Sequence, residues 1–222
     1  MAQRLREAET HRLIAGDAAL NFANTLNGHA RPAGHEYLHD FRDLALWCRH
    51  AGLLNAREAR AVLKHAAGHP AEARNLYRRS LALRESIFRV FRSMAVGGTL
   101  PARDLDRLNA AWREGQRHAK VAGSRAGFSL AWDDDALLER IPRAISSAAV
   151  QTLTSEKTSR VRACAGEGCD WLFIDDSRNH LRRWCSMDEC GNRAKMRRRQ
   201  QRKHLAVSAG RSRPGARRKT AS

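Results

Sequence analysis

The stretch from residue 164 to residue 203 reads CAGEGCDWLFIDDSRNHLRRWCSMDECGNRAKMRRRQQRK and contains two cysteine pairs of equal spacing. Four residues separate Cys164 from Cys169, four separate Cys185 from Cys190, and fifteen lie between the pairs. A structural zinc site takes four thiolate or imidazole donors at tetrahedral positions, commonly from two such pairs. The sequence therefore predicts one structural zinc ion held by these four cysteines. Four cysteines leave no open position on the metal, so catalytic zinc is not expected.

The residues around the cysteines predict the elements that would surround the metal. Gly166 and Gly168 allow the first pair to turn tightly, and the apolar run at residues 171–174 favours a short strand. A helix is expected to begin near residues 188–190 and to continue through Leu205. A knuckle, a hairpin and a helix that begins at the last ligands follow the order of a treble-clef zinc finger. So small a core would take most of its stability from the metal.

A dense run of cations follows the last cysteine, and no acidic residue occurs after Glu189. Like charges at this density repel one another on a helix, and a bound polyanion relieves the repulsion. A solvated helix face is the alternative interpretation. Lysine and arginine bind phosphates first, so the run alone does not distinguish DNA from RNA. The candidate nucleic-acid contacts are Arg178, His180, Arg182, Arg183, Asn192, Arg193, Lys195, Arg197, Arg198, Arg199, Arg202 and Lys203.

The charge of the 222-residue chain is unevenly distributed. There are 41 Lys and Arg against 23 Asp and Glu, a net charge of +18, and the pI is about 11.2. Residues 160–222 hold 17 basic and 6 acidic residues, a net of +11. A positive field of this size favours polyanionic partners. The change in composition predicts a boundary near residues 154–160, with a domain at 1–155, the finger at 160–204 and a disordered basic tail at 205–222.

The compartment follows from what the sequence contains. No apolar run approaches the length of a transmembrane helix, and the charged first ten residues do not resemble a secretory signal. We therefore expect a cytoplasmic, nucleoid-associated protein with reduced thiols, in which clustered cysteines indicate metal rather than disulfides. Cys48, the fifth cysteine, lies beside Trp47 on an apolar helix face and is expected in the core.

The first 155 residues read as mainly helical. Asp40 is placed to cap one helix, and Asn55 with Glu58 has the spacing of a capping box for a second. Pro70 suits the first turn of a long helix ending near Ala95. A further helix follows Pro101, a β-hairpin is expected within residues 117–132, and a last helix would run from Asp133 or Asp134 to about Leu153, bent or shortened by Pro142. The predicted fold is a mainly α, multihelical domain with a small β-hairpin, followed by a treble-clef-like zinc finger.

The motif at residues 185–195, CSMDECGNRAK, resembles the signature of the CGNR zinc-finger family, as do the upstream segments 173–180 and 183–185. Residues 16–25, GDAALNFANT, resemble the opening motif of the ABATE domain, which precedes this finger in the same family. The resemblance implies a bacterial, stress-induced transcription regulator with a DNA-binding zinc finger. The family usually has Asp where this chain has Asn21, which makes a cationic effector less expected here.

If the N-terminal domain senses a small molecule, forms a homodimer, or does both, its polar residues near the opening motif are the first candidates. Asn24 and Thr25 are equally suited to capping, and for Arg84 a surface role is favoured over an inward contact with Asn24. An RNA- or ribosome-associated protein is the main alternative to a DNA-binding regulator. An enzyme with a site around Asp17 is less expected, because no nucleophile–base pair is visible. The candidate ligand contacts are Asp17, Asn21, Asn24, Thr25 and Arg84.

Overall fold

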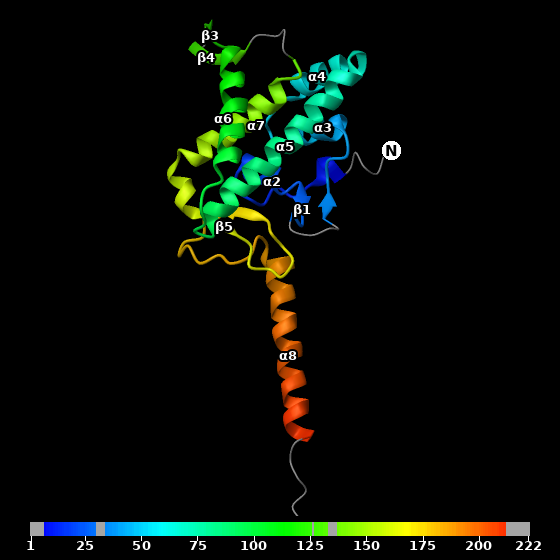
Figure 1. Ribbon diagram of the computed structural model, residues 1–222, viewed down its shortest axis with the longest axis vertical. Helices are drawn as coiled ribbons and strands as arrows, with labels where there is room; N and C mark the ends of the chain where they lie inside the picture. Colours follow the sequence, from blue (N-terminus) through cyan, green and yellow to red (C-terminus); the bar gives the residue numbers. More distant parts are fainter. Residues whose placement is uncertain (1–6, 30–33, 126, 133–136, 212–222) are drawn as a thin grey trace, which may run out of the picture.

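A computed structural model describes residues 7–29, 34–125, 127–132 and 137–211, and Figure 1 shows a helical body from which one long helix projects. The mainly α fold expected from the sequence is confirmed. The elements of the body are α2 (Ala18–Ala23), β1 (Leu26–Asn27), β2 (His35–Glu36), α3 (Phe41–His50), α4 (Ala56–Gly68), α5 (Pro70–Ala95), α6 (Ala102–Arg117), β3 (Ala119–Ser124), β4 (Gly127–Trp132) and α7 (Arg140–Leu153).

Two helices begin at the capping residues that the sequence indicates, and a third begins at the predicted first-turn proline. The Asp40 side chain accepts the N–H of Asp43 at the start of α3. Asn55 and Glu58 form a reciprocal capping box on α4, and Pro70 occupies the first turn of α5. These signals act within one helical turn, so the sequence alone determines them.

Helix α7 begins later than expected. It runs from Arg140, and the two aspartates proposed as its caps, Asp133 and Asp134, lie outside the described residues. Pro142 falls in the first turn, where its missing N–H costs no helical hydrogen bond. The proline therefore lies where a helix tolerates it, near the start of α7 and not in its middle.

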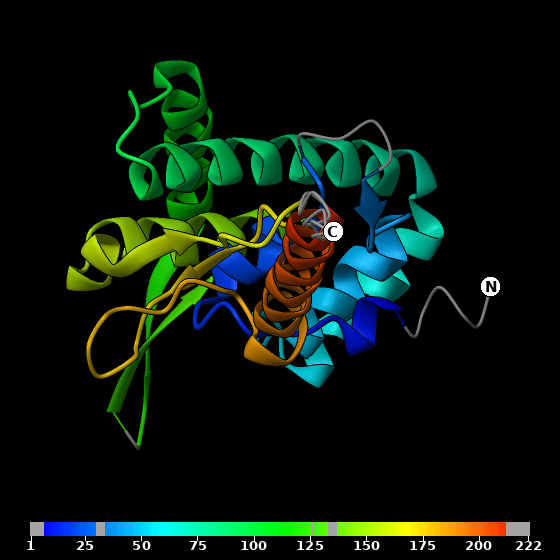
Figure 2. The same cartoon turned by 90° about the horizontal axis from the view of Figure 1, so that it is seen from below.

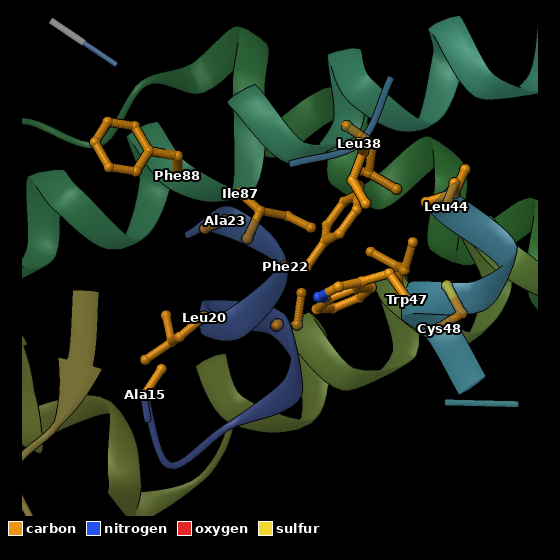
Figure 3. Packing of buried hydrophobic residues seen from close by; sticks show 14 of the residues in the cluster. Ala15, Leu20, Phe22, Ala23, Leu38, Leu44, Trp47, Cys48, Ile87 and Phe88 are labelled. Atoms are coloured by element: carbon orange, nitrogen blue, oxygen red, sulfur yellow. The ribbon is translucent and has the colours of Figure 1, made fainter. Parts of the chain in front are cut away.

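Helix α2 lies at the centre of the hydrophobic core. Phe22 packs against Trp47 with ring centroids 5.3 Å apart, and both side chains are fully buried beside Ile87 of α5 (Figure 3). Cys48 is buried in the same cluster, as predicted, and burial raises the pKa of its thiol. The short helix is thus enclosed by the longer helices around it.

The C-terminal third is packed on this same core. Strand β5 (Val161–Ala163) pairs antiparallel with β6 (Leu172–Ile174), and β6 is buried along its length. One continuous cluster of buried hydrophobic side chains includes residues of α2, α3, α5 and α7 together with β6 and three of the four predicted zinc ligands. The free edge of β6 is covered by the N-terminal segment, because Ile174 N–H donates to the Ala15 carbonyl at 2.8 Å.

Helix α8 (Asn192–Arg211) leaves the body along the long axis of the molecule, as Figures 1 and 2 show from two directions. It extends through residues 205–211, which the sequence analysis assigned to a disordered tail, and residues 212–222 lie outside the described part. The correction has a local reason, since Leu205, Ala206 and Ala209 are compatible with helix. None of the helices in the described ranges has the length and hydrophobicity needed to cross a bilayer.

Candidate zinc centre and nucleic-acid interface

The four cysteines predicted as ligands meet at the junction of the β5–β6 hairpin and the start of α8. Their sulfur atoms all lie within 4.8 Å of one another. Sγ of Cys185 is 3.7 Å from Sγ of Cys169 and 3.7 Å from Sγ of Cys190. A tetrahedron with Zn–S distances of about 2.3 Å has sulfur–sulfur edges of about 3.8 Å. The cluster therefore has the donors and the size to hold one zinc ion.

Backbone groups turn toward the sulfurs from both knuckles. The N–H groups of Gly166 and Cys185 donate to Sγ of Cys164 at 3.4 and 3.3 Å. A Cβ at Gly166 would lie 3.0 Å from Sγ of Cys190, so a side chain there would press on a ligand atom. Gly168 has φ of +73°, which favours glycine in this turn. The prediction that these two glycines form the knuckle has a physical basis in both positions.

The sulfurs strongly affect one another's protonation. Hydrogen bonds from the side chains of Cys169 and Cys185, helped by the backbone donors, lower the pKa of Cys164 to about 2. Hydrogen bonding to that thiolate raises the pKa of Cys169 to about 12 and raises the pKa of Cys185 further. A cluster this compact carries several negative charges only when a cation lies among them, and Zn²⁺ supplies that charge when bound.

The loop between β6 and Cys185 is organised by Asp175, which is fully buried. Its carboxylate accepts the N–H and hydroxyl of Ser177 and the N–H of Arg182. Burial acts to raise the pKa of Asp175, but these hydrogen bonds lower it below its ordinary value. His180 adopts φ of 52° here, and its Nδ1 contacts the Asp175 carbonyl at 3.1 Å. The loop keeps its shape through a buried anion.

Arg182 has its guanidinium folded over the finger. The guanidinium lies 4.4 Å from the centre of the Phe173 ring and donates to the carbonyls of Trp184 and Cys185. These donors are therefore engaged within the chain. Arg183, in contrast, is exposed and lies 5.4 Å from the Trp184 ring centre, and Arg178 is exposed on the same loop.

The base of α8 is fastened on one side by three arginines. Nη2 of Arg193 donates to Sγ of Cys190 at 3.0 Å. Arg197, one turn later, forms an ion pair with Glu167 in the first knuckle, and Arg12 of the N-terminal segment pairs with Glu189. A cavity of about 800 Å³ opens on this side of α8, and Arg193 and Arg197 are among the residues that line it.

The opposite side of α8 borders a basic groove of about 790 Å³. Its four cations occur at helical spacing of three and four residues, so they share one face of the helix. Trp184 and Met187 form an apolar end beside the zinc cluster. Among the described residues, no ion pair holds any of the four cations. We call this face the basic groove, and its cations are Lys195, Arg198, Arg199 and Arg202.

The remaining predicted contacts of the finger lie near the groove or beyond it. Asn192 lines both sides of α8, and its Nδ2 donates to the Asp188 carbonyl at 3.0 Å. Lys203 follows Arg202 on α8, and its side chain lies outside the described part of the chain. The predicted set therefore includes cations that face the groove, cations that hold the finger together, and two exposed cations of the loop, Arg178 and Arg183.

The residues of the N-terminal domain that were predicted to contact a ligand form hydrogen bonds within the chain. The Asp17 side chain caps α2 by accepting the N–H groups of Ala19 and Leu20. Asn21 Oδ1 accepts the Ala15 N–H at 3.0 Å. Asn24 donates to the Leu172 carbonyl and accepts its N–H, both at 2.9 Å. The suggestion that these residues bind an effector stays a prediction.

Arg84 is buried, with only 3% of its surface exposed, and does not occupy the surface position that the sequence favoured. It forms two hydrogen bonds of 2.7 Å with the Glu36 carboxylate and one of 3.2 Å with Oγ1 of Thr25. Asn24, the inward partner that the sequence suggested for Arg84, instead donates a hydrogen bond to the Leu172 carbonyl of strand β6. Glu36 lies 48 residues away in sequence, so helical periodicity could not reveal this pair.

The sequence patterns of two known families together match most of the chain. Residues 160–203 match the CGNR zinc finger. Residues 16–156 match ABATE, which is described as "Putative stress-induced transcription regulator". The chain belongs to the ABATE family. No curated protein matches it. The first description names a zinc finger and the second names a regulator, and neither names an enzyme.

The four letters of the CGNR motif have separate contacts in this member of the ABATE family. Cys190 belongs to the sulfur cluster, and Gly191 is buried where Met187 crosses it. Asn192 bonds back to the preceding turn, and Arg193 bonds to the Cys190 sulfur. The motif is recognisable from the sequence, but its arginine was predicted to contact nucleic acid and instead contacts the Cys190 sulfur.

Sequence reasoning missed two residues on which the site depends. Asp175 supports the loop before Cys185, and the signal for it was available, because an Asp two residues before a Ser favours a local turn. His11 is buried between Trp47, which donates to its Nδ1 at 3.2 Å, and Trp171 of the finger. Nothing local to His11 indicates this role.

Proposed function

We propose that the chain is a DNA-binding transcription regulator whose zinc-ordered helix α8 enters the major groove of duplex DNA. The observation that carries this proposal is the basic groove, where four cations share one face of a helix that projects from the body. Because no intramolecular anion holds them in the described residues, their charge is available to phosphates.

The shape of α8 favours duplex DNA over duplex RNA. The helix has 20 residues, a length of about 30 Å at about 1.5 Å per residue. The major groove of B-DNA is about 12 Å wide and admits an α-helix. The major groove of A-form RNA is too deep and narrow for the same element. A projecting helix with a charged face therefore fits DNA better.

The proposed contacts have different tasks. Lys195, Arg198, Arg199 and Arg202 would neutralise phosphates and set the position of the helix. Asn192 at the start of α8 and the exposed Arg183 would approach the DNA beside them. Arg193 and Arg197 lie on the other side and are engaged by Cys190 and Glu167. Zinc, when bound, fixes the base of the helix and contributes no chemistry of its own.

A competition experiment on the zinc-loaded chain tests the proposal. Fluorescence anisotropy would measure binding to a labelled DNA duplex, with unlabelled duplex DNA or a structured RNA as competitor at equal salt. We expect duplex DNA to compete better than RNA. Equal or better competition by RNA would favour the RNA-binding alternative, and no DNA binding at low salt would refute the proposal.

Two variants locate the contact surface. Replacing Arg198 and Arg199 by Gln should weaken DNA binding, because both lie in the basic groove. Arg197→Gln is the control, since Arg197 lies on the same helix but is paired with Glu167, and Arg198→Gln alone is the variant that matches it in charge. If the control weakened binding more than the double variant, the assignment of the face would be wrong. Sequencing the DNA fragments bound in cells would then test the regulatory part of the proposal.

A further inference from the structure

The contact between Arg193 and Cys190 points to a role that the nucleic-acid proposal does not include. Nη2 of Arg193 lies 3.0 Å from Sγ of Cys190. The two residues are three positions apart, so the arginine side chain reaches back over the turn that precedes it. Arginine is always protonated in proteins, so the contact is a charge-assisted hydrogen bond to the Cys190 sulfur, which would be a thiolate when it holds zinc.

The charge of the cluster explains why a cation at this position matters. Four thiolates and one Zn²⁺ carry two net negative charges. Cys164 receives two backbone N–H donors, whereas the Cys190 sulfur receives the arginine. Among the described residues, Arg193 is the cation that donates directly to a sulfur of the cluster. Its guanidinium offsets about half of the excess charge where α8 begins.

The position of Arg193 on α8 separates it from the basic groove. Arg193 lines the cavity beside the cluster, and the groove is lined by Lys195, Arg198, Arg199 and Arg202. Arg197, one turn further along the same side, is paired with Glu167 of the first knuckle. This side of the helix therefore faces the metal-binding loops and not the surface proposed for DNA.

We propose that Arg193 is a positioning residue of the zinc centre, which stabilises the Cys190 thiolate and ties the metal to the first turn of α8. Groups that hydrogen-bond to metal ligands raise the metal affinity, and their loss typically lowers it about 10- to 100-fold. The proposal concerns the metal and does not require that the chain bind DNA.

The test compares two neutral variants of the same helix in the full chain. Arg193→Met removes the donor and keeps an unbranched side chain, and Arg198→Met removes the same charge from the other face. Zinc affinity would be measured by competition with a coloured chelator. We expect Arg193→Met to lower zinc affinity about 10- to 100-fold and Arg198→Met to leave it unchanged. Arg193→Lys should recover part of the loss.

A spectroscopic measurement separates this role from general destabilisation. In the Co²⁺-loaded chain, the thiolate-to-cobalt charge-transfer band should move to longer wavelength in Arg193→Met. The thiolate electrons are bound less tightly once the cationic donor is gone. The band of Arg198→Met should not move. Unchanged zinc affinity together with an unshifted band in Arg193→Met would overturn the proposal.

Binding to DNA at saturating zinc supplies an independent comparison. Arg193→Met should keep more of the wild-type affinity for a DNA duplex than Arg198→Met. If Arg193→Met lost as much DNA affinity as Arg198→Met while zinc affinity stayed normal, Arg193 would belong to the nucleic-acid surface instead.

Discussion

The amide of Asn24 joins the two parts of the chain that the family patterns separate. Asn24 ends helix α2, and its side chain bonds to both backbone groups of Leu172, 148 residues later, at 2.9 Å each. Both residues are buried, with exposures of 1% and 0%. The amide thus takes the place of a neighbouring strand at the free edge of β6. Replacing Asn24 by Leu keeps the number and branching of the side-chain heavy atoms and removes both hydrogen bonds.

The size of the effect follows from what the substitution leaves behind. The N–H and C=O of Leu172 would remain buried without partners, and each such group costs about 1–3 kcal/mol. We therefore expect Asn24→Leu to lower the free energy of unfolding by about 2–6 kcal/mol. This is a large share of the roughly 5–15 kcal/mol by which domains are stable. Zinc affinity should fall as well, because the neighbouring Trp171 carbonyl accepts the N–H of Cys164, one of the predicted ligands, at 2.9 Å.

Urea denaturation of the zinc-loaded chain would measure the effect, followed by far-UV circular dichroism for the helices and by a chelating dye for zinc release. Asn55→Ala is the control, since it removes an exposed helix cap worth about 1 kcal/mol. In the wild type, the helices and the zinc should be lost together. A shift no larger than that of Asn55→Ala, or zinc release well before helix loss, would show that the Asn24 amide does not couple the zinc site to the helical body.

Three further outcomes follow from individual groups. Arg84→Met should destabilise the fold by somewhat less than the roughly 3–5 kcal/mol typical of a broken buried ion pair, because its partner Glu36 is partly exposed; thermal melting measures this. Burial lowers the pKa of His11 from 6.5 to about 4, so the unfolded chain binds the extra proton first and up to about 3 kcal/mol of stability is lost as pH falls from 6.5 to 4. His11→Gln should flatten that part of the profile of stability against pH. The wild type is the reference, because acid releases zinc from both proteins alike. Zinc removal by a chelator, or Cys190→Ser, should abolish DNA binding in the anisotropy assay, and full binding by the metal-free chain would contradict the link between metal and helix.

The helices of the body were largely predictable because their signals are local. Asp40, the Asn55–Glu58 box and Pro70 each act within one turn of the helix they begin. The cysteine spacing likewise led to a cluster that the structure brings together. Both kinds of signal need only neighbouring residues and the known demands of a helix end or a metal ion.

The roles of individual polar residues were much less predictable, because their partners are distant in sequence. Buried Arg84 is hydrogen-bonded to Glu36, and the Asn24 side chain is hydrogen-bonded to the backbone of Leu172. Composition identified a basic segment, but it could not show that Arg182 and Arg193 point into the finger. Which side of a helix meets the body depends on packing that the charge pattern does not contain.

The dependence of DNA affinity on salt concentration would show directly whether the basic groove of α8 contacts the phosphates of DNA. Each phosphate contact contributes about 0.9 to the slope of log K against log salt concentration. Neutralising Lys195, Arg198, Arg199 and Arg202 together should therefore make the slope shallower by up to about 3.6, with one zinc ion per chain retained. Wild-type chain and variant showing the same slope would contradict the claim that the zinc-ordered face of α8 binds the DNA backbone.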